Sequence, residues 1–306
     1  MRLITKLVPI IFMGLMLFGI SSPVRAEFNP WGDFKFPEVK PPALQVGQSA
    51  SYKINVAGVP EAPGPVNASL RMAVVGKETI EGSSFYWFEL DIGDIAGLPP
   101  EAAGFVSSFK LKALVKDIPQ EKYKEDPKAL MKEFARGNIM RKLVFQIDDK
   151  APQMIDFMTL QGLAQALGGM DLESLVDEIP FDEMEENPEN PMKDMKFNCG
   201  SENVSVSGKA YNNASFCTFE GTDEEEKVTF KGKTYMHESV PIGAFLKMAF
   251  DVHNAEKNEK INLSMELIDY KTAGATSQII GEPVPFDFGA LMGGMAGGMP
   301  PMGGME

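Results

Sequence analysis

Apolar and polar residues alternate with period two over much of the chain, which predicts β-strands with one buried face. The clearest runs are SASYKINV at residues 49–56 and NASLRMAV at residues 67–74. In each run every second residue is apolar or aromatic, and the residues between are mostly serine, asparagine, lysine or arginine. The pattern therefore predicts strands whose apolar side chains share one face of a sheet.

The same alternation recurs before and after a different central segment. It predicts a hairpin over residues 74–92, with its turn in the region from Gly76 to Gly82 and an aromatic second strand. Because short links join most of the strands, antiparallel pairing is expected. The further strands are predicted at 109–115, 139–147, 202–206, 214–219, 227–231, 233–237, 245–252 and 261–268.

Helical spacing is confined to the middle of the chain. EDPKALMKEFARG, residues 125–137, has a candidate N-cap at Asp126, a proline in the first turn and a stop signal at Gly137. The segment 152–178 carries methionine and leucine at helical spacing. Residues 180–194 are acidic and interrupted by proline, which predicts a solvated loop.

Together these elements predict an α+β fold. We expect a curved, mostly antiparallel, open barrel-like sheet with two or three helices covering one face, chiefly the segment 152–178. A single β-rich domain would span residues 47–282, with a helical insertion at about 126–178. A proline- and aromatic-rich arm at 27–46 would either pack against this domain or form a loose linker. A Met- and Gly-rich tail at 283–306 is predicted to be disordered.

The N-terminus has the three parts of a secretory signal. Arg2 and Lys6 precede an apolar run from Leu7 to Ile20, and small residues allow cleavage after Ala26. This run is shorter than the ~20 residues that cross a bilayer as a helix. The sequence therefore predicts an exported chain with no stable membrane span after cleavage, periplasmic in a Gram-negative bacterium.

Charge and cysteine content narrow the functional class. The chain has 43 acidic against 29 basic residues and a formal net charge of −14, which disfavours nucleic acid as a partner. Its two cysteines, Cys199 and Cys217, predict one structural disulfide in an oxidising compartment.

No catalytic signature is recognisable. The two histidines are His237 and His253, and His237 stands beside Glu238 and Ser239 in a predicted strand, where neighbouring side chains face apart. The acidic stretches at 181–187 and 222–227 lack the spacing of a calcium loop. We expect a non-enzymatic protein without a cofactor.

The C-terminal tail raises a separate hypothesis. Five methionines lie among glycine and proline, and thioethers are suited to Cu(I), while methionine also makes adaptable contact surfaces. Three interpretations of the tail remain open: a disordered end, a contact surface for a partner, and a copper site. The methionines are Met292, Met295, Met299, Met302 and Met305.

The region KTYMHESVPIGAFLKMAFDV followed by INLSMELIDYKTAGA resembles the closing strands of the LolA/LolB-like lipoprotein-carrier superfamily and exported relatives. The resemblance rests on Val240, Pro241, Gly243, Lys247 and the strand 261–268. It implies an unclosed antiparallel barrel with a helical lid over an apolar cavity that takes acyl chains. The cavity wall would then include Tyr86, Phe88, Leu90, Leu246, Met248 and Phe250, and the lid Phe157, Met158 and Leu163.

Three functions follow from the sequence. The leading hypothesis is an exported protein that binds or carries a lipid-like ligand, although the same residues would also fill a packed core. The second is a structural or interaction protein of the cell envelope that contacts a partner protein through the arm and the tail. The third is Cu(I) binding by the tail.

Overall fold

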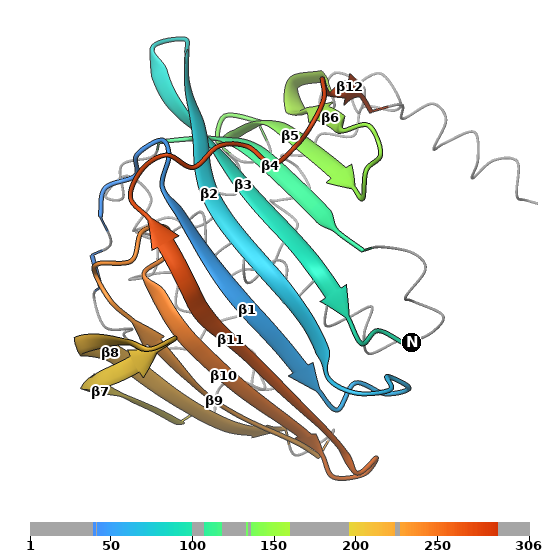
Figure 1. The fold of residues 1–306 in the computed structure, drawn as a ribbon, viewed down its shortest axis with the longest axis vertical. Coiled ribbons are helices and arrows are strands. Elements are labelled where there is room, and N and C mark those ends of the chain that lie inside the picture. Colours follow the sequence, from blue (N-terminus) through green and yellow to red (C-terminus); the bar gives the residue numbers. More distant parts are fainter. Residues whose placement is uncertain are drawn as a thin grey trace, which may run out of the picture.

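The computed structural model contains one twelve-stranded sheet, which is strongly twisted (Figure 1). It describes residues 39–40, 42–99, 107–117, 133, 136–159, 196–223 and 227–286. The strands are β1 (Ser49–Ala57), β2 (Val66–Ile80), β3 (Ser83–Ala96), β4 (Phe109–Lys116), β5 (Met140–Ile147), β6 (Gln153–Asp156), β7 (Lys196–Val206), β8 (Lys209–Asp223), β9 (Val228–Met236), β10 (Phe245–Asn254), β11 (Glu259–Lys271) and β12 (Val284–Pro285).

The strand order joins the two halves of the chain at the centre of the sheet. It runs β12-β6-β5-β4-β3-β2-β1-β11-β10-β9-β8-β7. Each pair is antiparallel except β12 with β6, which is parallel. Because β1 pairs with both β2 and β11, the first strand and the last long strand lie side by side, and the sheet forms only after both halves of the chain are present.

The predicted α+β class is wrong, because the described chain is almost entirely β-structure. Residues 153–156, expected to open a helix, instead form β6 and pair with β5 from Lys142 to Phe145. Helical residues in the described ranges amount to position 133 and one turn at 157–159. The backbone hydrogen bonds that residues 153–156 form with the edge of β5 outweigh the helical periodicity of this segment. Local periodicity is a weak determinant of secondary structure beside tertiary pairing. Residues 160–195 lie outside the described ranges.

A second correction concerns Gly232, which the sequence placed at a break between two strands. The strand β9 continues through it, and the ring of Phe219 lies over it. A Cβ at Gly232 would stand 2.2 Å from that ring. The glycine therefore leaves space for Phe219 to reach Phe250 on β10, with ring centroids 5.6 Å apart.

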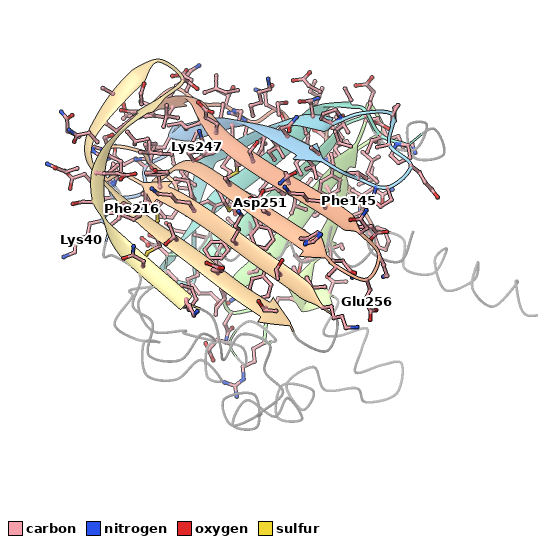
Figure 2. The ribbon with its side chains drawn as sticks, turned by 90° about the horizontal axis from the view of Figure 1, so that it is seen from below. Lys40, Phe145, Phe216, Lys247, Asp251 and Glu256 are labelled. Carbon is pink, nitrogen blue, oxygen red and sulfur yellow. A yellow bond between two sulfur atoms is a disulfide. The ribbon has the colours of Figure 1, made fainter. Side chains whose placement is uncertain are left out.

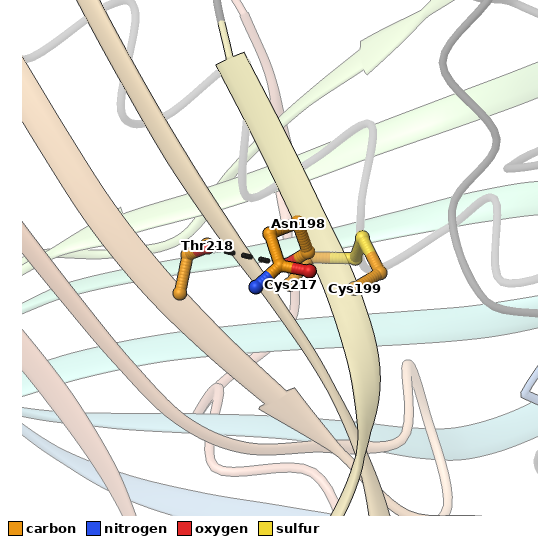
Figure 3. The surroundings of a disulfide bond; sticks show 4 residues. All are labelled: Asn198, Cys199, Cys217 and Thr218. Atoms are coloured by element: carbon orange, nitrogen blue, oxygen red, sulfur yellow. Dashed lines mark hydrogen bonds between the residues drawn. A yellow bond between two sulfur atoms is a disulfide. The ribbon is translucent and has the colours of Figure 1, made fainter.

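The predicted disulfide is confirmed. Cys199 and Cys217 are directly opposite each other on β7 and β8, with Cα atoms 4.1 Å apart, and Cys217 is buried (Figure 3). Beside the bridge, the hydroxyl of Thr218 donates to the carbonyl of Asn198 at 3.1 Å. The bridge fixes the register of the hairpin that forms one edge of the sheet.

After β11 the chain crosses the sheet as a strap, which we define as residues 272–286. It passes in front of the central strands in Figure 1 and ends at β6, where β12 pairs with Gln153 and Met154. Its start is anchored by Gly47, whose carbonyl accepts from the amide of Ala275 at 2.8 Å. Gly47 has φ +96°, and a Cβ there would lie 2.6 Å from the amide nitrogen of Gly274, so only glycine fits this crossing. The described part of the chain extends through the strap to residue 286 and so includes residues 283–286, the first residues of the predicted tail.

Buried residues concentrate where β1, β2, β10 and β11 meet. Tyr52 has no exposed surface, and its hydroxyl donates to the carbonyl of Phe245 at 3.3 Å. Val39 and Leu44, at the end of the predicted arm, pack against this core. The arm's aromatic residues Phe28, Trp31, Phe34 and Phe36 lie outside the described ranges.

Candidate ligand-binding face

The cross-strand register places a continuous set of apolar side chains on one side of the sheet, which we call the inner face. Tyr52 stands opposite Leu70 on β2 and Leu267 on β11, and Leu70 stands opposite Ile92 on β3. Directly paired residues project from the same side of a sheet, so each row extends across the strands. Taken strand by strand across the sheet, the inner-face positions are Leu143, Phe145 and Ile147 on β5; Phe109, Leu111, Ala113 and Val115 on β4; Tyr86, Phe88, Leu90 and Ile92 on β3; Leu70, Met72 and Val74 on β2; Ala50, Tyr52, Ile54 and Val56 on β1; Ile261, Leu263, Met265 and Leu267 on β11; and Met248, Phe250 and Val252 on β10.

None of these side chains carries a charge at neutral pH. Along the stretch that these rows cover, the charged residues of the same strands project from the other side, the outer face. Lys247 and Asp251, labelled in Figure 2, are two of them, and they pair with Glu266 at 4.0 Å and Lys231 at 3.9 Å. The alternation read from the sequence therefore separates an uncharged face from a charged one.

The inner face is only partly covered. Tyr52, Leu70 and Leu267 are fully or almost fully buried at its centre. By contrast, a set of large apolar residues on β3, β4 and β5 is only partly buried: Phe88, Ile92, Phe109, Leu143 and Phe145. Ile54 and Met248 form a second partly buried group across β11. Apolar surface left accessible in this way is a candidate contact surface for an apolar ligand.

The structure places the predicted cavity residues in two separate groups. Tyr86, Phe88 and Leu90 lie on the inner face of β3, while Met248 and Phe250 lie on the inner face of β10. Three strands separate β3 from β10, a distance of ~19 Å at the usual strand spacing, so the two groups share a face without touching.

The remaining predicted residues are Leu246, Phe157, Met158 and Leu163. Leu246 lies in a β-bulge between Phe245 and Lys247 and is fully buried, so it belongs to the packed core. Phe157 and Met158, expected in a lid, directly follow β6, and Met158 is 51% exposed. Leu163 lies outside the described residues.

Sequence reasoning missed three aromatic residues of the inner face. Phe109 and Phe145 follow the alternation of their strands and could have been named from it. Phe286 could not, because it reaches Phe145 only after the strap has passed over β5 and paired with β6. The two ring centroids are 5.8 Å apart, and the amide of Phe286 donates to the carbonyl of Met154 at 2.8 Å.

His237 and Ser239 do not continue the predicted strand, which ends at Met236. They lie in the turn after β9, and the Nδ1 atom of His237 is 2.8 Å from the hydroxyl of Ser239. The Nε2 atom faces the carbonyl of Asn212 at 3.2 Å rather than a carboxylate.

Two tyrosines and a lysine lie beside this turn. Lys209 donates to the hydroxyl of Tyr270 at 3.0 Å, and this contact lowers the pKa of Tyr270. Tyr211, whose ring packs against His237 with centroids 5.4 Å apart, has a pKa raised by burial. These contacts join the turn to β8 and β11.

The five tail methionines proposed as Cu(I) ligands all lie outside the described residues. Within the described ranges, no group of three or more His, Cys, Asp or Glu residues could hold a metal ion. In the same ranges, no helix is long and apolar enough to cross a membrane.

Comparison with known proteins matches the chain to solved structures but to no sequence family. No family model matches the chain, and no curated protein matches it. Among solved structures, one similar chain is a protein from Bacteroides fragilis assigned to export, with a YmcC-like fold. It has 10% identity and a TM-score of 0.28, and the match covers 76% of this chain and 99% of that one.

Two further structures are similar. A protein from Parabacteroides distasonis assigned as a lipoprotein has 10% identity and a TM-score of 0.28, covering 77% of this chain and 97% of its own. A LolA superfamily protein from Nitrosomonas europaea has 12% identity and a TM-score of 0.22, covering 80% and 93%. The resemblance to LolA-like or exported proteins expected from the sequence is therefore found as a structural similarity, and similarity at this level shows neither ligand nor function.

Proposed function

We propose that the chain is an exported, non-enzymatic protein that holds an apolar, lipid-like ligand against the inner face of its sheet. The observation that carries the proposal is the uncharged inner face, on which Phe88, Phe109 and Phe145 are only partly buried. Burying apolar surface stabilises a complex by about 25 cal/mol per Å² before the costs of association are subtracted. A ligand of hydrocarbon character would gain this energy without needing a hydrogen-bond partner.

Export is supported by two independent features. Residues 1–26 have the order of charge, apolar run and small residues that secretory signals have. The Cys199–Cys217 disulfide is of the kind that persists in oxidising compartments. A periplasmic site in a Gram-negative bacterium is the location that this proposal implies.

Two positions on opposite faces of the sheet provide a matched test. Phe88 projects from the inner face of β3, and Ala249 is exposed on the outer face of β10. We expect Phe88→Glu to weaken binding of cis-parinaric acid, a fluorescent fatty acid, by at least tenfold, because a carboxylate would be placed against hydrocarbon. Ala249→Glu adds the same charge on the outer face and should leave the binding curve unchanged.

The measurement is a fluorescence titration of each purified protein, after circular dichroism has established that both variants keep the β spectrum. Equal weakening by both variants would indicate a general effect of charge rather than contact with the inner face. Wild-type protein that gives no saturable signal would contradict the proposed function.

A further inference from the structure

Beyond its apolar surface, the inner face has one cationic end. The strand β2 has a β-bulge between Val74 and Gly76. Without it, the alternation Leu70, Met72, Val74 would continue to positions 76 and 78. The extra residue shifts the alternation by one, so that Lys77 stands opposite Tyr86 and shares its face.

Lys77 and Tyr86 form a pair at this end. The Lys77 ammonium donates to the Tyr86 hydroxyl at 3.4 Å and lies 4.9 Å from the centroid of its ring. Tyr86 is 8% exposed and packs edge to face against Phe88, with ring centroids 6.5 Å apart. Since the tyrosine oxygen accepts from lysine, its own proton remains free to be donated outward.

Lys77 differs from three lysines of the outer face, Lys231, Lys233 and Lys247. Each of these three pairs with a carboxylate. Among the described residues, none supplies a carboxylate to Lys77. Two donors therefore converge at the end of an uncharged surface, and an anionic group would receive charge-assisted hydrogen bonds from both.

The opposite end of the inner face has the other sign. On the β10–β11 hairpin, Asn254 and Glu259 follow Val252 and Ile261 on the inner side. In Figure 1 this hairpin and the β2–β3 hairpin extend from opposite ends of the sheet. An amphiphile with an anionic head would thus be attracted at the Lys77 end and repelled at the Glu259 end.

We propose, building on the proposed function, that the ligand is a long-chain fatty acid whose carboxylate binds Lys77 and Tyr86. Its chain extends along Phe88 toward Ile92, which is ~20 Å from Tyr86 along the strand, comparable to a long acyl chain. The two carboxylate oxygens match the two donors, one for the ammonium and one for the phenol.

Paired probes separate the head group from the chain. The probes are cis-parinaric acid and cis-parinaryl alcohol, which share one hydrocarbon chain. We expect wild-type protein to bind the acid about tenfold more tightly than the alcohol, as one charge-assisted hydrogen bond would provide. Lys77→Met should remove this preference by lowering the affinity for the acid about tenfold. Tyr86→Phe should lower the affinity for the acid several-fold. Neither variant should change binding of the alcohol.

Lys53→Met is the matched control, because Lys53 is exposed on the outer face of β1 and should leave both affinities unchanged. If acid and alcohol bind equally well, and Lys77→Met alters neither, the head-group assignment fails while the proposed function stands. If neither probe binds saturably, the proposed function itself fails. Displacement of the probe by lysophosphatidic acid at lower concentration than by oleic acid would overturn the choice of a carboxylate.

Discussion

Replacing Glu89 with alanine is expected to lower the free energy of unfolding by about 3–5 kcal/mol, the usual result of removing one partner from a buried ion pair. The Glu89 side chain has no exposed surface and lies 3.0 Å from the Arg71 guanidinium, which is 20% exposed. It also accepts from the hydroxyl of Ser277 and, at 2.7 Å, from the amide of Gln278. The substitution would therefore leave one partly buried cation and two strap donors without their acceptor.

The strap should detach in this variant, because its other contacts with the central strands are few. Arg71 donates to the carbonyl of Thr276 at 2.8 Å, and Gln146 exchanges two hydrogen bonds of 3.3 Å with the backbone of Ile280. Ala73 and Val144 share a cross-strand row with Glu89 and are buried on the outer face. Loss of the strap would uncover them.

Urea unfolding followed by circular dichroism measures the expected loss, and limited proteolysis of residues 272–283 reports release of the strap. Glu220→Ala removes an exposed carboxylate from the outer face of β8 and should change stability by less than about 0.5 kcal/mol. A Glu89→Ala loss below 1 kcal/mol, with the strap still protected, would show that the buried carboxylate does not hold it.

Removing both cysteines, in the variant Cys199→Ala/Cys217→Ala, is expected to lower the free energy of unfolding by about 3 kcal/mol. The bridge closes a sequence separation of 18 residues and joins β7 to β8 at an edge of the sheet. Without it, the unfolded chain gains conformational entropy, and among the described strands the hairpin is held by ladder pairing with β9 and by the contacts of Ser207 and Lys209 with β11.

The test compares urea unfolding of the double variant with unfolding of the wild-type protein in the presence and absence of dithiothreitol. Reduced wild type should match the double variant, and oxidised wild type should be more stable than both. Equal midpoints for all three samples would mean that the register of β7 and β8 is set by strand pairing alone.

Strand positions could be predicted from the sequence where one face of the strand is apolar. The run from Ala50 to Val56 alternates without interruption and forms β1 as expected. The length of β2 was underestimated. This strand continues to Ile80 through a β-bulge at Val75, which no local sequence pattern indicates. The break expected at Gly232 was wrong because the need for a glycine arises from a ring on the neighbouring strand.

Helix prediction failed for a different reason. Met154 has helical spacing relative to later residues, yet residues 153–156 pair with β5, whose free edge is visible only in three dimensions. The contact between the strap and Glu89 could not be predicted from the sequence either, because Ser277 lies 188 residues from Glu89 along the chain. The inner face, in contrast, could be anticipated from Phe88 and Met248, since alternation alone assigns residues to a face. The position of Lys77 on that face required the bulge.

Photo-crosslinking with a diazirine-labelled fatty acid tests most directly whether the uncharged face holds a ligand. Labelled peptides, identified by mass spectrometry, are expected to come from inner-face positions such as Phe88, Ile92 and Phe145, and excess oleic acid is expected to prevent the labelling. Crosslinks scattered over outer-face positions such as Lys53 and Lys247, or labelling that oleic acid does not reduce, would contradict this expectation.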